Sequence, residues 1–303
     1  MQTSEEAQKE VFRVTPIYDI LLRGSVDMPI GLYHLHLAKA EQLCRLHYSP
    51  GSIKAIKARL RKLADEHYVQ FDTIPTKFFR SPYYYTLDYE GVRYLGRAGM
   101  DMGESFRASK EVDKHALFVE HTLELNDVLI AAALLKRVAP GYYLDSFIHE
   151  RTLKVAPYRA VWRGGRFSLI PDAFLDFRLA LPDGQRRMSV LLEHDRGTEE
   201  QRHFRRRIRA YIMMLKSEAH KDWFGVKSIT IAFTTFVGAK RLAQMREWTK
   251  QELAVTGESK AIGLAFCFAN LTQSLDPHYL WLEPCWYTSY EEGQQPIALL
   301  VGE

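Results

Sequence analysis

The sequence has few cysteines, no long apolar run and no low-complexity segment. Its three cysteines, Cys44, Cys267 and Cys285, form no Cys-x-x-Cys pair, which argues against a zinc knuckle and favours reduced, buried thiols. The longest uncharged apolar run, residues 128–135, is much shorter than the roughly 20 residues that cross a bilayer. Residues 1–10 are acidic and polar and do not resemble a secretory signal. We therefore expect a cytoplasmic protein without a membrane span.

Glycine and proline are not enriched, with 18 and 12 residues among 303, which excludes collagen-like and Gly/Pro-rich chains. The chain is 47% hydrophobic and 26% charged with a net charge of +4, and these values exclude intrinsic disorder. The length is typical of about two domains. Because +4 is too small to indicate a nucleic-acid binder by itself, the positions of the basic residues decide what they imply.

The first part of the chain predicts two helices followed by a hairpin. Residues 49–67 predict a helix capped by Ser49, and their apolar residues recur every three or four positions and so share one face. A shorter helix is expected over residues 37–46. Residues 68–73 and 83–87 are β-prone and flank a turn, which is typical of a hairpin.

Basic residues lie on the longer predicted helix and in the hairpin loop. Those expected to contact DNA are Lys54, Lys57, Arg61, Lys62, Lys77 and Arg80. This layout predicts a winged helix-turn-helix domain over residues 15–100, with the basic helix in the major groove and the hairpin tip beside the backbone. Residues 51–80 hold seven Lys or Arg and three Asp or Glu, an excess of four that equals the excess of the whole chain. The alternative is an ordinary solvated helix face.

A helix over residues 104–137 is expected to connect this domain to a second one, over residues 138–303, and to pack with the second. The second domain predicts strands that alternate with helices, which indicates an α/β sheet layer. The predicted strands lie within residues 170–195, 228–234 and 261–268, and the predicted helices lie at 199–216 and 240–253.

Residues 170–195 predict a hairpin with Asp183 and Gly184 as its two-residue turn. With that turn Asp172 lies opposite Asp195, and strand alternation puts Glu193 on the same face as Asp195. Three clustered carboxylates repel one another unless protons or a cation neutralise them, and Mg²⁺ is the usual reason to gather oxygen ligands in this way. Such a metal could activate water against a phosphate. The alternatives are exposed side chains at a strand end, or pairing with nearby arginines.

The helix at 199–216 is dense in arginine. Five of them lie within eight residues: Arg202, Arg205, Arg206, Arg207 and Arg209. Because so many spread around the helix, some must face solvent or a phosphate backbone, and we expect Arg202 and Arg206 to contact DNA. A solvated face with acidic partners is the alternative.

These features in this order resemble the replication-relaxation family of plasmids and integrative conjugative elements. The resemblance covers about residues 30–215, and its most specific parts are Pro171-Asp172 and the run from Glu193 to Thr198, Glu-His-Asp-Arg-Gly-Thr. It implies a DNA-binding protein of a mobile element, linked to plasmid replication and DNA relaxation, with replication or relaxase-complex proteins as partners.

The second part also resembles the PD-(D/E)xK nuclease superfamily, in which acids on adjacent strands hold Mg²⁺. Asp172 matches the first acid and Glu193 the second, whereas Asp195 stands where the superfamily has lysine. Some members carry the basic residue on the following helix, where Arg207 matches best; an arginine can stabilise a phosphate but is a poor proton shuttle. The resemblance implies these four residues as the catalytic set, with the three acids as Mg²⁺ ligands if the site is active.

Three functions follow from the sequence. The first is a DNA-binding protein of a mobile genetic element that reads duplex DNA through a winged helix. The second is an active Mg²⁺-dependent DNA endonuclease or nickase. The third is a transcriptional repressor with a degenerate nuclease-like domain. Each is compatible with a homodimer, because duplex readers often use two half-sites.

Overall fold

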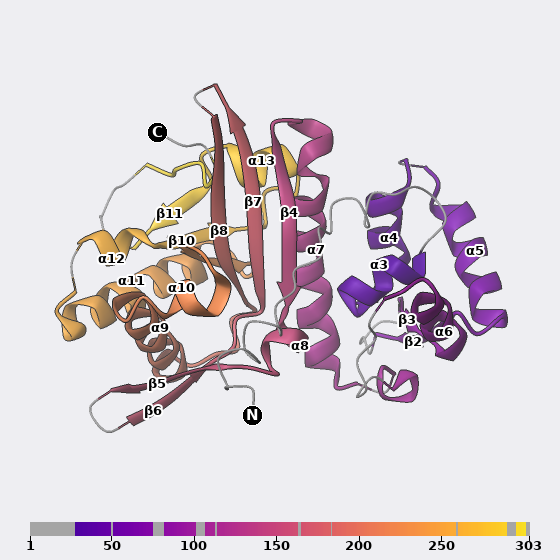
Figure 1. Ribbon diagram of the computed structural model, residues 1–303, viewed down its shortest axis with the longest axis horizontal. Coiled ribbons are helices and arrows are strands. Elements are labelled where there is room, and N and C mark those ends of the chain that lie inside the picture. The colour runs from indigo at the N-terminus through magenta and orange to yellow at the C-terminus, as the bar shows by residue number, and fades with distance from the viewer. Residues whose placement is uncertain are drawn as a thin grey trace. The chain divides into compact units, whose positions relative to one another are not determined.

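A computed structural model describes residues 28–49, 51–74, 82–100, 107–112, 114–162, 165–182, 184–258, 260–289 and 295–300. These residues divide into two compact units (Figure 1), and the boundary falls inside helix α7 (Ala116–Val138), between Leu134 and Leu135. Both helices and strands are abundant, so the predicted α/β class is confirmed. No helix in the described ranges is at once long and apolar enough to cross a membrane.

The N-terminal unit, up to Leu134, combines helices with a three-stranded antiparallel sheet of order β1-β3-β2. The predicted hairpin is present as β2 and β3. Besides α7, the elements are α3 (Met28–Leu35), β1 (Leu37–Ala38), α4 (Ala40–His47), α5 (Ile53–Asp65), β2 (Val69–Thr73), β3 (Tyr83–Leu87), α6 (Tyr89–Arg97) and the 3-10 helix η1 (Ala108–Lys110).

Within this unit α7 is tied to the first elements by buried side-chain amides. Asn126 donates to the carbonyl oxygens of Leu35 and Leu37 at 3.0 and 2.7 Å, and Gln42 of α4 donates to the carbonyl oxygen of Leu123 at 2.7 Å. Both amide side chains are buried, so these bonds satisfy polar groups that water does not reach. The expectation that residues 104–137 form a connector packed on the second domain stays a prediction.

The C-terminal unit, from Leu135, is built on a six-stranded mixed sheet of order β11-β10-β9-β8-β7-β4, with a separate β5–β6 hairpin. Strands β8, β9 and β10 are parallel, and the outer strands are antiparallel to their neighbours. The elements are β4 (Tyr142–His149), α8 (Glu150–Leu153), β5 (Tyr158–Trp162), β6 (Gly165–Leu169), β7 (Ala173–Leu181), β8 (Gly184–Asp195), α9 (Gln201–Lys216), α10 (Ala219–Phe224), β9 (Thr230–Thr235), α11 (Ala239–Thr256), α12 (Lys260–Leu264), β10 (Phe266–Asn270), α13 (Pro277–Leu282) and β11 (Trp286–Thr288).

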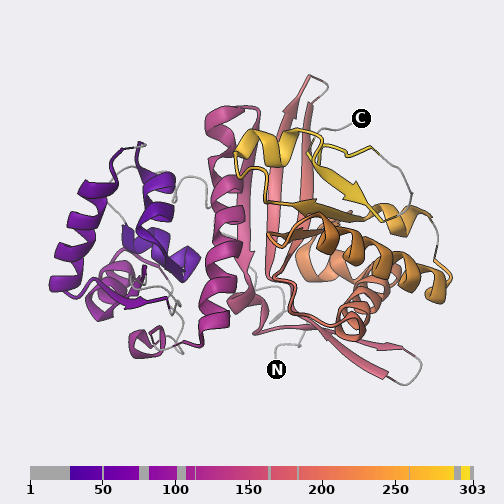
Figure 2. The same cartoon turned by 180° about the vertical axis from the view of Figure 1, so that it is seen from behind.

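Helices α9 and α11 lie side by side on one face of this sheet (Figure 2). Each belongs to a crossover between neighbouring parallel strands, and two right-handed crossovers that advance in the same direction put their helices on the same face. Their apolar residues, among them Phe204, Tyr211 and Met245, join strand residues such as Phe233 in one buried cluster. Polar side chains of β8 that point to this face therefore lie next to α9 and α11.

The aromatic C-terminal segment completes the core on the other face. Phe177 of β7 alternates with the cluster residue Phe174, and its ring centroid lies 4.9 Å from that of Trp281 on α13. Trp281 and Trp286 are both fully buried. Burial of these two large rings shows that the segment contributes packing to the sheet.

The predicted register of the β7–β8 hairpin is wrong by two residues. The last pair before the loop is Leu181 with Gly184, so Pro182 lies in the loop rather than in the ladder. Proline has no N–H to donate and does not suit the paired position that the predicted turn gave it. In the observed register Ala173 faces Leu192.

Candidate functional site

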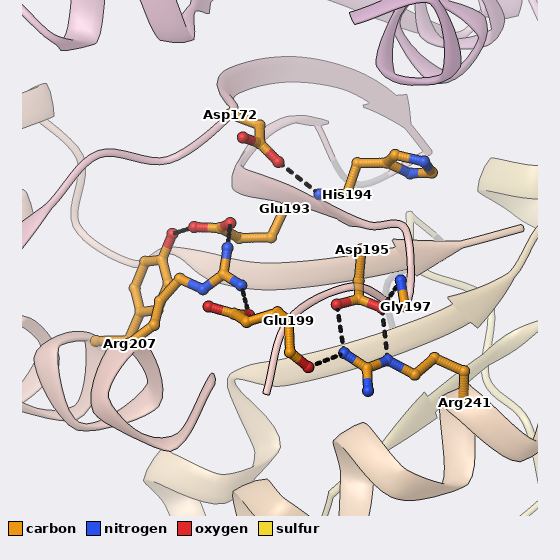
Figure 3. Close-up of polar contacts among 9 residues, drawn as sticks. Asp172, Glu193, His194, Asp195, Gly197, Glu199, Arg207 and Arg241 are labelled. Carbon is orange, nitrogen blue, oxygen red and sulfur yellow. Dashed lines mark hydrogen bonds and ion pairs between the residues drawn. The ribbon is translucent and has the colours of Figure 1, made fainter. Parts of the chain in front are cut away.

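The carboxyl end of β8 carries two buried acids, and each meets an arginine from a different helix (Figure 3). Glu193 and Asp195 share one face, as the alternation of the strand predicts. Arg207 of α9 binds Glu193, and Arg241 of α11 binds Asp195. The strand end is therefore joined to both covering helices by polar contacts.

Glu193 is held from α9 by two donors. The Arg207 guanidinium and the Tyr211 hydroxyl each donate to one of its carboxyl oxygens. Arg207 also pairs with Glu199, which lies between β8 and α9. Tyr211 is fully buried. Its ring packs in the core, and its hydroxyl donates to Glu193.

Burial raises the pKa of the Glu193 carboxyl to about 8; the Arg207 guanidinium lowers it and the nearby Asp172 charge raises it. Burial beside Glu193 also raises the pKa of the Tyr211 hydroxyl well above its ordinary value. Burial therefore favours the protonated form of both groups, and Arg207 contacts Glu199 as well as Glu193.

Asp195 forms the more complete ion pair. Arg241 donates through Nε and an NH2 group to the two carboxylate oxygens at 2.7 and 2.8 Å, and also to the Glu199 carbonyl oxygen at 2.9 Å. The Gly197 N–H donates to Asp195 Oδ1 at 2.8 Å. Gly197 has φ +74°, and a Cβ there would lie 3.0 Å from Val237, so the turn requires glycine.

Asp172 lies near Glu193 but not with Asp195. Its Oδ2 accepts the His194 backbone N–H at 2.7 Å, and its charge acts on the pKa of Glu193. The observed register explains this pairing, since Asp172 precedes Ala173 and Glu193 follows Leu192. The structure thus brings the first two predicted acids together and directs the third to α11.

The acids at the end of β8 do not offer the ligands that a divalent cation needs. Such a cation needs ionised oxygens with lone pairs open to it, yet both oxygens of Glu193 accept bonds from α9 and both oxygens of Asp195 accept bonds from Arg241. Across the described ranges, no three His, Cys, Asp or Glu side chains are grouped so as to hold a metal ion. Arginine supplies the positive charge that the sequence led us to assign to Mg²⁺.

Four of the predicted DNA-contacting residues lie on one side of α5. We call this the α5 basic face; its exposed members are Lys54, Lys57, Arg61 and Lys62. The opposite side of the helix buries Ile56 and Leu60. Within this face, Lys57 forms an ion pair with Glu41 at 2.7 Å, and both side chains are more than half exposed. An exposed pair of this kind contributes little stability and exchanges readily.

Of the two remaining groups of predicted DNA contacts, the structure describes only the one on α9. Lys77 and Arg80 lie outside the described residues. Arg202 and Arg206 are exposed on α9 and line a cleft of about 670 Å³ beside the β5–β6 hairpin. Arg206 donates to the Arg166 carbonyl oxygen at 3.0 Å, which fixes its direction.

Reasoning from the sequence missed Arg241 and Glu199. Arg241 is 46 residues from Asp195 in the chain, so no local motif joins them. A signal was nevertheless present, because Arg241, Met245 and Trp248 recur at helical spacing and place a cation on an apolar stripe. A buried cation requires a buried acid, and Asp195 is that acid.

The fold and the site define an α/β protein in which arginines of two helices bind the acids at the end of a central strand. The chain belongs to the replication-relaxation family, whose sequence pattern matches residues 31–228. Membership associates the chain with plasmid or mobile-element replication or relaxation. The comparison with curated proteins found no match, and neither did the comparison with solved structures.

Proposed function

We propose that the protein binds duplex DNA of a mobile genetic element, with the N-terminal unit acting as a winged helix-turn-helix. In this reading α5 enters the major groove and the β2–β3 hairpin lies beside the backbone. The C-terminal unit has a nuclease-like arrangement without a metal-dependent role. We expect it to act in the cytoplasm together with replication or relaxase-complex proteins.

The α5 basic face carries this proposal. Its members recur at positions i, i+3, i+7 and i+8, so four cations project from one stripe while Ile56 and Leu60 hold the other side in the core. Arg59 is not part of the stripe, since it donates to the Tyr48 hydroxyl at 3.3 Å across the turn from α4. A rigid cationic stripe on a helix that follows a short helix and a tight turn suits a phosphate-lined groove.

The test is duplex binding by the full chain as a function of salt. Lys54→Ala, Lys57→Ala and Arg61→Ala combined should weaken binding and lower the slope of log K against log salt by about 2.7, at about 0.9 per phosphate contact. A control removes three exposed lysines of the C-terminal unit, through Lys221→Ala, Lys227→Ala and Lys240→Ala. If the α5 variant and the control bind alike, α5 is not the DNA-reading helix.

The nuclease alternative requires Glu193 and Asp195 to exchange their arginines for a metal, and no contact of the described residues favours it. A plasmid assay decides the matter: supercoiled DNA should stay intact with the protein and Mg²⁺. Cleavage that disappears in Asp172→Ala would establish the nuclease instead. A footprint confined to the protein's own promoter would favour the repressor.

A further inference from the structure

The C-terminal unit has a basic surface of its own between α9 and the β5–β6 hairpin. We call it the arginine cleft; it encloses about 670 Å³ and is lined by Arg166, Phe167, Gln201, Arg202, His203, Arg205, Arg206 and Arg209. Five of the eight lining residues are arginines and none is acidic. A concave surface of one sign concentrates counter-ions of the opposite sign.

One buried acid organises two of these arginines. Glu252 of α11 has a fully buried side chain and accepts from the Nε atoms of both Arg205 and Arg209. One carboxylate therefore balances two guanidiniums, and the cleft keeps an excess of positive charge. The pairing also holds both arginines in fixed positions along α9, which lowers the entropy lost when they bind an anion.

The hairpin supplies the second wall. Phe167 packs under α9, and the guanidinium of Arg206 lies 5.5 Å from its ring centroid. Arg159, Val161 and Arg166 share the outward face, because Arg166 pairs with Val161 and Arg159 lies two positions away. The hairpin projects from the end of the six-stranded sheet beside α9 in both views (Figure 1, Figure 2).

We infer that the arginine cleft binds the phosphodiester backbone of DNA, as a second contact that is separate from the α5 basic face. The inference extends the proposed function, since it rests on DNA being the partner. Arg202 and Arg209 lie two helical turns apart, about 10 Å along the axis of α9, so the cleft is long enough to contact more than one phosphate of a strand. A guanidinium can bind two phosphate oxygens at once, and a contact made to phosphates alone does not depend on the base sequence.

The experiment uses the full chain with Arg202→Ala and Arg206→Ala combined, since both residues line the cleft from α9 and are exposed. The slope of log K against log salt on a labelled duplex should fall by about two, near one unit for each lost phosphate contact. The matched control is Lys227→Ala with Lys240→Ala, which removes the same charge elsewhere on this unit. Arg202→Lys with Arg206→Lys should restore the slope.

Three results separate the possible outcomes. If the cleft variant and the control have the same slope, the cleft does not contact DNA. If the cleft variant loses binding of inorganic tripolyphosphate but keeps its DNA slope, the cleft binds small anions and the DNA assignment is wrong. Comparison with the α5 variant separates the two proposals. If the cleft substitutions lower the salt slope and the α5 substitutions leave it unchanged, the α5 assignment is wrong and the cleft assignment stands.

Discussion

Arg207 and Arg241 are the residues that define the end of β8. Each of the two buried acids on this strand face is bound by a guanidinium from a different helix. The pairs also fix the positions of α9 and α11, because each arginine must reach its own acid. The contacts of Arg207 and Arg241 therefore hold α9 and α11 against the end of β8.

Loss of Arg241 should be costly. Arg241→Met leaves Asp195 buried without its cation, and removal of one partner of a buried pair typically costs about 3–5 kcal/mol of unfolding free energy. Asp195→Asn added to Arg241→Met should recover a large part of this loss. Urea unfolding measures both variants, and equal stability of the wild type and Arg241→Met would show that the pair does not hold the fold.

Glu193 should make stability depend on pH. Burial raises its pKa from an ordinary value of 4.5 to about 8, so between these values the folded state holds a proton that the unfolded state has released. The free energy of unfolding contributed by this group is therefore greatest below about pH 4.5 and falls as the pH rises through 8. Glu193→Gln removes the contribution, and its stability profile should be flatter over this window. Identical profiles would refute the raised pKa.

The candidate acids could be chosen from the sequence, and Arg207 could be named through the superfamily resemblance, but Arg241 could not. Alternation put Glu193 and Asp195 on one face, and that prediction is confirmed by their contacts with α9 and α11. The convergence with Asp172 depended on the turn, and a two-residue error in register moved Asp172 from Asp195 to Glu193. Pairing with arginines was one of the alternatives; the choice of Arg241 depends on a tertiary contact that no local pattern encodes.

Helices were easier to predict than their ends. Periodicity located α5 and α9, yet α5 begins at Ile53 after Ser52 rather than at Ser49, because Ser49 closes the preceding turn with its carbonyl. The predicted strand at 261–268 is wrong over its first half, where α12 precedes β10. A short apolar run fits a helix or a strand equally well, and only the packed neighbours decide.

The turn from β8 to α9 should be sensitive at Gly197. Gly197→Ala forces a side chain into a positive φ and within 3.0 Å of Val237, with a loss of about 1–3 kcal/mol in unfolding free energy. Gly225→Ala is the control, since Gly225 also has a positive φ but no neighbouring atom within 4 Å. Thermal unfolding should rank Gly197→Ala below Gly225→Ala, and the reverse order would contradict the close approach.

For the whole molecule, the ion pairs predict indifference to divalent metal. A ligand that binds only the folded state raises the melting temperature, so about 10 mM Mg²⁺ should leave the melting temperature unchanged once ionic strength is matched. A rise that disappears in Asp172→Asn would show that a metal does bind among these acids.

The chain's three cysteines make a direct test of DNA contact possible. All three are buried, and burial raises the pKa of the Cys267 and Cys285 thiols to about 12, so neither is readily alkylated. A cysteine introduced at an exposed position can therefore be labelled selectively. Ala58 is exposed in the middle of the α5 basic face, and Ser228 is exposed on the C-terminal unit.

The decisive measurement is DNA cleavage by an iron chelate tethered to α5. With Ala58→Cys labelled and bound to duplex DNA, hydroxyl radicals formed at the helix should cut the strands several-fold more than the same chelate on Ser228→Cys. That result would place α5 against DNA, as the account predicts. Equal cleavage by the two conjugates, with both fully bound, would contradict it.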